Sequence, residues 1–369
     1  MRKGWEYKRL DECANIEYGT RVVQKKDSGT LYPVYGGGGE TFRMDKFNRE
    51  DCLIVARFAM SRRCVRFVNG KFFLNDSGLS VKAGDKLYQS YLNYNIISLN
   101  DDIYHLGKGA AQRNLDVKSF KKLTIAIPPQ STQLAIVSEL DKINELIRLK
   151  KEQLKDFDNL AQSLFYEMFG DPVENEKGWE VKKLGEIGEF KNGLNFSKDE
   201  NGHSIKFLGV SDFQNKKSIA SDQLAYISLS ERVQEDYLLK TGDIVFVRSN
   251  GNKELIGRSV KMYITEPTTY SGFCIRCRIT DEKVDKDYIA ILLKTPIIRQ
   301  FMTNSGRGCN ISNLNQKVLN SIPTILPPLS LQRLFAQRIE QIEREKSEVQ
   351  KSIQDLETLL ASRMQYWFE

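Results

Sequence analysis

The sequence has almost no histidine and no long apolar run. Only two of its 369 residues are histidines, His105 and His203, and they lie far apart in the chain. A histidine-based metal centre or catalytic triad is therefore not expected. No stretch of roughly 18 apolar residues occurs, so no membrane-spanning helix is predicted. The amino terminus, MRKGWEYKRLDE, is charged and lacks the apolar core of a secretory signal, so we expect a cytoplasmic protein.

Cysteine is sparse and scattered. The six cysteines include one Cys-x-x-Cys pair, Cys274 and Cys277, and no second pair that would complete a tetrahedral zinc site. This pair lies in GFCIRCRI, whose alternation is typical of a strand. We therefore expect reduced cysteines that serve packing, and no metal or cofactor bound by this chain.

Motifs of motor and methyl-transfer chemistry are also missing. There is no GxxxxGK[ST] loop for an ATP-driven motor. An amino-methyltransferase needs a polar-Pro-Pro-aromatic loop around its flipped base, whereas the two Pro-Pro pairs here stand in IPPQ (127–130) and LPPL (326–329). The segment GDPVENEKG (170–178) has carboxylates and a lysine that could hold magnesium, but its composition favours a solvated linker. No catalytic residue is predicted.

Positive charge is concentrated in the first third of the chain. The net charge is +7, and residues 1–128 hold 22 basic residues against 14 acidic ones. A basic surface is the electrostatic footprint of a polyanion partner, although many solvated surfaces are equally basic.

The chain contains two copies of one pattern. GWEYKRLDECANIEYG (4–19) matches GWEVKKLGEIGEFKNG (178–193), at an offset of 174 residues. GKGAAQRNLDVKSFKKLTIAIPPQSTQ (107–133) matches GRGCNISNLNQKVLNSIPTILPPLSLQ (306–332), at an offset of 199 residues. The second copy is therefore longer in its middle. The two copies are similar at their ends and different in their middles. This pattern indicates a shared structural frame that holds two different recognition surfaces.

A long helix is predicted after each Pro-Pro pair. Ser131 and Ser330 follow the prolines and are natural N-caps. Apolar residues then recur in steps of four and three, interrupted by Lys150, Lys346 and Arg363, which predicts a coiled-coil seam. The seam residues are Ile136, Leu140, Ile143, Ile147, Leu154, Phe157, Ala161, Leu164 and Met168, and then Phe335, Ile339, Ile342, Val349, Ile353, Leu356, Leu360 and Trp367.

The two helices are expected to pair antiparallel, with one module at each end of a helical rod. At 1.5 Å per residue the rod would be about 55 Å long, or about one and a half turns of B-DNA. Within the modules, short alternating runs such as LIVARF, CVRFV and DIVFVR read as strands, so each module is a mixed α+β domain. Trp5 and Trp179 are expected in the core, and Gly36–Gly39 in a flexible loop.

Taken together, these features resemble the specificity subunits of type I restriction–modification systems. The resemblance rests on GWE…L at each module start, Asn-Leu…Pro-Pro…Gln at each end, the heptad helices, and SLFYEMFGD closing the first helix. YPVYGGGGETF (32–42) and IKFLGVSDF (205–213) also look like pieces of that family's target recognition domains.

The resemblance implies an α+β fold class with a pseudo-twofold internal repeat. Target recognition domains would span residues 1–129 and 171–328. They would be separated by two long antiparallel coiled-coil helices, a central spacer helix at 130–170 and a C-terminal one at 329–369. The ending SRMQYWFE favours a chain that is complete at this point.

The resemblance further implies a non-catalytic, DNA-binding specificity subunit. Each domain would bind one half of a bipartite site in double-stranded DNA. The helices would dock two modification subunits, which bind S-adenosylmethionine and methylate adenine. Restriction subunits, with ATP and Mg, would join that core, so all cofactors would sit on partner subunits and none on this chain.

Candidate DNA-binding residues follow from the chemistry of base reading. Arginine recognises guanine, asparagine or glutamine recognises adenine, and phosphates need lysine or arginine. In the first module the candidates are Arg57, Ser61, Arg62 and Arg63, followed by Lys108, Gln112 and Arg113. In the second they are Arg248, Ser249, Asn250, Asn252 and Lys253, followed by Arg307 and Asn310. Arg62-Arg63 could equally form a solvated turn, and Asn250-Gly251 a simple hairpin turn.

Other functions stay open at this point. A fused methyltransferase–nuclease would need the missing motifs. A coiled-coil adaptor that binds only proteins would not need the basic first module. A closer variant keeps the DNA reading but serves another methylation-based defence system that lacks a restriction motor.

Overall fold

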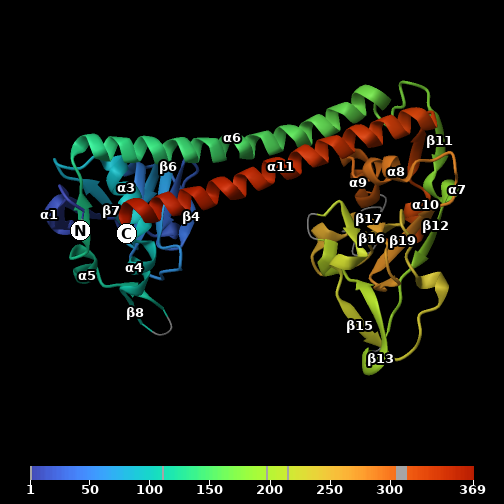
Figure 1. Ribbon diagram of the computed structural model, residues 1–369, viewed down its shortest axis with the longest axis horizontal. Helices are drawn as coiled ribbons and strands as arrows, with labels where there is room; N and C mark the ends of the chain where they lie inside the picture. Colours follow the sequence, from blue (N-terminus) through green and yellow to red (C-terminus); the bar gives the residue numbers. More distant parts are fainter. Residues whose placement is uncertain (1, 110–111, 197, 214–215, 305–313) are drawn as a thin grey trace. The chain divides into compact units, whose positions relative to one another are not determined.

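The computed structural model describes residues 2–109, 112–196, 198–213, 216–304 and 314–369 (Figure 1). The chain forms two compact units, Met1–Glu152 with Val349–Glu369, and Gln153–Glu348. The long helices α6 (Gln130–Phe169) and α11 (Leu329–Phe368) each contribute one part to either unit. Each unit therefore consists of one α+β domain and a pair of helix segments.

The first unit is built around a six-stranded sheet. Its strands are antiparallel to their neighbours, except for β3 and β6, which are parallel. Helices α3 (Gln89–Ser98) and α4 (Asn100–His105) pack apolar side chains against the sheet. The strand order is β2 (Ala14–Tyr18), β7 (Gly78–Ala83), β5 (Arg49–Ala56), β6 (Val65–Leu74), β3 (Tyr32–Gly36) and β4 (Gly39–Met44). Short helices α2 (Gln24–Asp27) and α5 (Val117–Lys121) lie in the connections.

The second unit repeats the centre of this sheet and adds to it. The order β12 (Gly188–Asn192), β19 (Cys274–Ile279), β16 (Ile244–Val247) and β17 (Ser259–Tyr263) reproduces β2-β7-β5-β6. Strand β14 (Ser218–Ala220) extends it, and β15 (Tyr226–Leu229), β13 (Lys198–Leu208) and β18 (Thr268–Tyr270) form a second sheet. The helices are η1 (Val210–Phe213), η2 (Ser221–Gln223), η3 (Glu235–Tyr237), η4 (Lys253–Leu255), α8 (Lys286–Leu292), α9 (Pro296–Asn304) and α10 (Gln316–Asn320).

Within each copy, the segment at the start pairs with the segment at the end. In the first unit β1 (Glu6–Arg9) is antiparallel to β10 (Thr124–Ile127), and in the second β11 (Glu180–Lys183) is antiparallel to β20 (Pro323–Leu326). A one-turn helix follows at the same point of each copy, α1 (Leu10–Cys13) or α7 (Leu184–Ile187). The start and end of each copy therefore form one closed frame, which confirms the predicted tandem repeat.

The long helices pair antiparallel in both units, as predicted. Every seam residue named from the sequence is buried or half-buried. Two of the polar interruptions find carboxylates on the facing helix: Arg363 binds Glu139, and Lys346 binds Asp158 at 2.5 Å. Figure 1 shows α6 and α11 side by side over each domain. These two charged members of the seam therefore pair with the opposite helix instead of interrupting it.

The helix starts differ from the prediction. Ser131 and Ser330, predicted as the caps, are instead the second residues of α6 and α11, two positions after the residue that caps each helix. In α6 the carbonyl of Pro129 accepts hydrogen bonds from the N–H groups of Thr132 at 2.9 Å and Gln133 at 3.0 Å. The last proline therefore occupies the capping position, because its carbonyl accepts the first helical hydrogen bonds.

A buried glutamine ties each helix start to its domain. Gln133 and Gln332 are almost fully buried, and both use the side-chain amide in the same way. Oε1 accepts from a backbone N–H, and Nε2 donates to two backbone carbonyls. The partners of Gln133 are Tyr88 N (2.9 Å), Lys86 O (2.9 Å) and Pro128 O (3.0 Å), and those of Gln332 are Asp285 N (2.9 Å), Lys283 O (3.4 Å) and Pro327 O (2.7 Å).

Two further expectations have opposite outcomes. Trp5 and Trp179 pack against the cores, as predicted. Gly36–Gly39 is not a flexible loop, because β3 ends at Gly36 and β4 begins at Gly39, so the glycines form a tight hairpin. A Cβ on Gly37 would lie 2.2 Å from the carbonyl oxygen of Phe58, so this hairpin needs a glycine there.

We expect Gln332→Met to lower the free energy of unfolding by about 2–4 kcal/mol, because it leaves a buried N–H and two buried carbonyls without partners. Gln162→Met is the matched control, since Gln162 is exposed on α6, and it should change stability by less than about 0.5 kcal/mol. Urea unfolding of both variants measures the difference. Equal stability of the two would show that the amide does not hold the helix start.

Candidate nucleic-acid interface

In the first unit the candidate residues lie on two segments that are joined by hydrogen bonds. One is the β5–β6 loop, residues 57–64, and the other runs from β8 (Gly107–Lys108) to β9 (Asn114–Leu115). The N–H of Leu115 donates to the carbonyl of Arg57 at 2.8 Å, and that of Met60 donates to Arg113 at 2.9 Å. The structure therefore brings the two groups of first-unit candidates together at one end of the sheet.

Two of these side chains, Arg57 and Arg113, are held by aromatic neighbours. The Arg57 guanidinium lies 5.1 Å from the ring centre of Tyr18 and 4.5 Å from that of Phe58. Arg113 lies 4.7 Å from the ring centre of Tyr104. Each guanidinium also donates one hydrogen bond to a backbone carbonyl, Arg57 to Asp76 at 3.3 Å and Arg113 to Tyr104 at 3.2 Å. These contacts fix the direction of each arginine.

Lys108 has a different role. Its ammonium pairs with Asp116 at 2.6 Å. This contact, together with hydrogen bonds from Ser119, lowers the pKa of the Asp116 carboxyl to about 2. Lys108 therefore forms an ion pair with Asp116, the residue that caps the start of α5.

The remaining first-unit candidates, Ser61, Arg62, Arg63 and Gln112, are exposed. The backbone around the arginines is nevertheless fixed, since Asn100 donates to the Arg62 carbonyl at 2.9 Å and Arg66 to the Arg63 carbonyl at 2.9 Å. Neither guanidinium pairs with a carboxylate in the described part of the chain. Two exposed cations on a fixed loop suit contact with a polyanion.

The second unit places Arg248 where the first places Arg57. The N–H of Arg248 donates to the carbonyl of Phe273 at 2.8 Å, and its carbonyl accepts from Leu314 at 2.8 Å. Arg57 makes the same two bonds, donating to Ser77 at 2.8 Å and accepting from Leu115. The two arginines are therefore equivalent, although they are 191 residues apart and no sequence match joined them.

The side chains of Asn250 and Asn252 form hydrogen bonds within their own loop. Asn250 Oδ1 accepts from the N–H of Asn252 at 2.8 Å, and Asn252 Oδ1 accepts from Glu254 at 3.0 Å, while η4 begins at Lys253. Ser249 and Asn250 line a cavity of about 560 Å³ together with Phe273. Arg307 and Asn310 lie outside the described residues.

Sequence analysis did not identify a repeated glycine and several aromatic side chains that lie beside the candidate loops. A Cβ on Gly19 would lie 1.9 Å from the Asn75 carbonyl oxygen, and one on Gly193 would lie 2.2 Å from that of Ser271. The sequence did contain a signal for this glycine, because Gly19 and Gly193 occupy the same position in the two copies of the repeat. Tyr18, Phe58 and Phe273 are also exposed beside the loops, at 47%, 37% and 59%. Exposed rings next to basic loops suit stacking against nucleotides.

The described residues show how possible metal ligands and the Cys-x-x-Cys pair are placed. No cluster of three or more His, Cys, Asp or Glu side chains lies together among them. Cys274 and Cys277 are free and buried in β19, and burial raises the pKa of the Cys274 thiol to about 12. None of the helices that the structure describes has an apolar stretch able to cross a bilayer.

Two copies of one α+β frame, each with a polar loop cluster at the same strand ends, define a tandem-repeat protein with two candidate nucleic-acid surfaces. The chain belongs to the family of the type I restriction modification DNA specificity domain, whose model matches residues 2–156 and again 176–358. The two matches fall on the two copies, which makes the domain tandem.

Named relatives and solved structures agree with this assignment. The chain is 24% identical to the type I restriction enzyme StySPI specificity subunit of Salmonella potsdam, over 71% of this chain and 60% of that protein. It is 24% identical to the MjaVIII specificity subunit of Methanocaldococcus jannaschii, over 79% and 75%. Its fold is similar to the S subunit of the type I system from M. genitalium, with a TM-score of 0.57 at 18% identity, over 98% and 95% of the two chains.

We expect Gly193→Ala to lower the free energy of unfolding by about 1–3 kcal/mol, since the new methyl group would overlap backbone atoms. Gly251→Ala, in the adjacent loop, has nothing within 4 Å of the new Cβ and should change stability by less than about 0.5 kcal/mol. Thermal unfolding of the two variants tests the close approach. If Gly193→Ala is as stable as Gly251→Ala, the approach does not constrain the frame.

Proposed function

We propose that this chain is the DNA sequence-specificity subunit of a type I restriction–modification enzyme and has no catalytic site of its own. The observation that carries the proposal is the equivalence of Arg57 and Arg248. One backbone frame holds both arginines through the same hydrogen bonds, yet the side chains around them differ. A constant frame with two different loop sets suits the reading of two different half-sites.

Each domain would bind one half of a bipartite site in double-stranded DNA. In the first domain, the exposed Arg62 and Arg63 have the donors that reach guanine edges or phosphates. In the second, the loop of Ser249, Asn250 and Asn252 presents amides beside the exposed ring of Phe273. The basic balance of residues 1–128 supports contact with DNA.

The helices would dock two modification subunits. Leu134, Leu146 and Leu149 of α6 are about half exposed, and apolar side chains on the outside of a helix pair favour further helical packing. S-adenosylmethionine, ATP and Mg would be bound by the modification and restriction subunits. The missing motor and methyltransferase loops support this division, as do the relatives described as specificity subunits.

The direct test is methylome sequencing of cells that express this chain with its neighbouring modification subunit, compared with cells lacking only this chain. We expect methyladenine at one asymmetric, bipartite site. Replacing residues 1–128 by those of a relative should change one half-site and leave the other. If a verified active partner produces no new methylation, the proposal fails and a protein-only adaptor takes its place.

A second prediction concerns the exposed arginines. Arg62→Ala with Arg63→Ala should weaken binding to the duplex site by about 1–3 kcal/mol per lost base contact, or about 5–150-fold in Kd. Lys86→Ala is the control, because Lys86 follows β7 at the end opposite the loops, and it should change Kd less than about twofold. Fluorescence anisotropy measures both. Equal Kd values would assign Arg62 and Arg63 to a solvated turn.

A further inference from the structure

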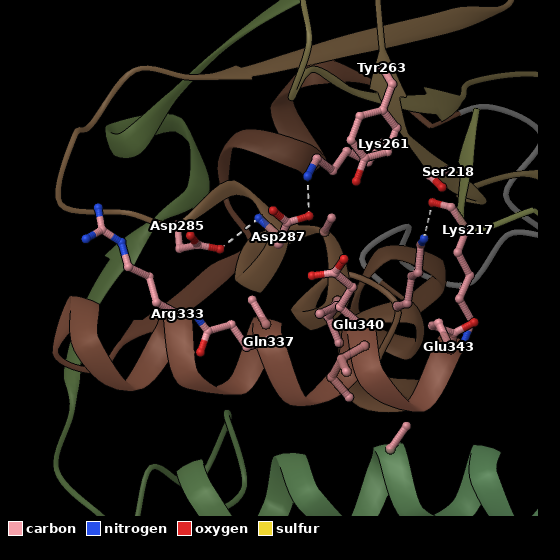
Figure 2. A pocket seen from close by; sticks show the side chains of 16 residues that line it. Lys217, Ser218, Lys261, Tyr263, Asp285, Asp287, Arg333, Gln337, Glu340 and Glu343 are labelled. Carbon is pink, nitrogen blue, oxygen red and sulfur yellow. Dashed lines mark hydrogen bonds and ion pairs between the residues drawn. The ribbon is translucent and has the colours of Figure 1, made fainter. Parts of the chain in front are cut away.

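The second unit contains two neighbouring cavities that share Lys217 and Lys294. The larger, about 590 Å³, lies between β17, α8 and the first turns of α11. Figure 2 shows the ammonium of Lys261 directed at Asp287, and Lys217 beside Glu343. The Lys217–Glu343 contact measures 2.5 Å. Two cations of the larger cavity, Lys217 and Lys261, are therefore paired with carboxylates.

The smaller cavity has a different charge pattern. Its volume is about 250 Å³, and we call it the basic pocket. Among the residues that the structure describes, five basic side chains line it and no acidic one does, although one of the five, Lys217, pairs with Glu343 in the larger cavity. The lining residues are Phe213, Lys216, Lys217, Gly257, Arg258, Ser259, Leu293, Lys294 and Arg299.

Lys294 is the basic residue most affected by these surroundings. Its Nζ donates to the backbone carbonyl of Lys217 at 2.6 Å. Burial and the neighbouring charge of Lys217 lower the pKa of Lys294 to about 8, and Glu343 offsets this only in part. The charged form of Lys294 is therefore less stable here than it would be in water, and an anion that enters the pocket would stabilise it.

Ser259 supplies an independent sign of a ligand. It begins β17, is 6% exposed and lines the basic pocket. Within the described ranges its buried hydroxyl has no hydrogen-bond partner. Buried hydroxyl groups are nearly always satisfied, so an unpaired one beside a cationic cavity indicates a missing acceptor.

The basic pocket adjoins the loop that begins at Arg248 and contains the candidates Ser249, Asn250 and Asn252, which we call the reading loop of the second domain. The N–H of Gly257 donates to the carbonyl of Val247 at 3.0 Å, and the N–H of Val247 donates to Arg258 at 2.9 Å. Arg248, the first residue of the loop, follows directly. A group held in the pocket would therefore lie next to the residues proposed to read bases.

We propose that the basic pocket binds one phosphate group, with Lys294 and Ser259 as direct donors and with Lys216, Arg258 and Arg299 supplying further positive charge. Its position beside the reading loop favours a phosphodiester of the DNA backbone. A free phosphate compound has the same chemistry and is the other source. With DNA as the source, the inference rests on the proposed function; with free phosphate, it does not.

The DNA arm uses the full chain and a non-specific duplex of about 30 base pairs, titrated over a range of salt concentrations. Lys294→Met should weaken binding about 3–10-fold and reduce the salt slope by about 1, because one phosphate contact is lost. Ser259→Ala should weaken binding about 2–5-fold and leave the slope unchanged, because no charge is removed. Lys294→Arg should retain the slope.

Lys283→Met is the matched control. Lys283 is exposed, and it follows β19 at the end opposite the Ser271–Phe273 turn and the reading loop. This variant removes the same charge from the same unit, and its Kd should change less than about twofold. Circular dichroism melting checks folding, and Lys294→Met should melt no earlier than the parent because it removes a cation from cationic surroundings.

The second arm titrates inorganic phosphate into the full chain and its variants by calorimetry. Phosphate binding that Lys294→Met abolishes, with DNA binding unchanged, would assign the pocket to a free phosphate compound. Unchanged binding of both DNA and phosphate in Lys294→Met and Ser259→Ala would overturn the inference. If the parent chain binds no DNA, the proposed function fails, and the phosphate titration alone decides the inference.

Discussion

The side-chain amide of a single buried glutamine holds each half of this protein in register. Gln133 and Gln332 each connect three backbone segments, namely the turn before a domain helix, the Pro-Pro pair and the first turn of a long helix. A buried amide without partners is costly, so the helix cannot start at another residue or tilt away from the domain without losing these bonds. The positions of the seam and of the loops in each unit follow from this junction.

Within the seam, apolar residues stabilise the helix pair, whereas charged residues determine the direction in which the two helices pair. Apolar heptad residues supply burial, and they would do so for either relative direction of the helices. The ion pairs of Arg363 with Glu139 and of Lys346 with Asp158 form only in the antiparallel arrangement seen here. Charged residues at seam positions therefore determine which helix pairs with which, and in which direction. The loops at the far ends of the strands take no part in the seam, so their sequences are free to vary.

Sequence reasoning succeeded where the pattern is long or local. The heptads of both helices and the tandem repeat were predicted, because a periodicity sustained over each 40-residue helix and two matching segments in each copy leave clear signals. The Gly36–Gly39 hairpin was not, since glycines carry no side-chain pattern and β3 is set by parallel pairing with the distant β6. The N-cap assignment was wrong because the proline carbonyl takes that position.

The candidate site was only partly predictable for a similar reason. The offset between the copies is 174 residues from Gly19 to Gly193 but 191 from Arg57 to Arg248, and β14 and β15 lie in between. This insertion hid the equivalence of the two arginines. The basic pocket was missed because its members come from three separate segments, around Phe213–Lys217, Gly257–Ser259 and Leu293–Arg299. Only the fold brings these segments together.

The division of the chain between the two units has a consequence for its synthesis. The second unit is continuous, Gln153–Glu348, whereas the first also needs Val349–Glu369. That segment brings the Trp367 indole to Glu139 at 3.0 Å and the ring of Phe368 to Tyr91. The domain that leaves the ribosome first is thus the one completed last. Early termination near the 3′ end of the message would damage the amino-terminal domain and leave the one translated after it intact.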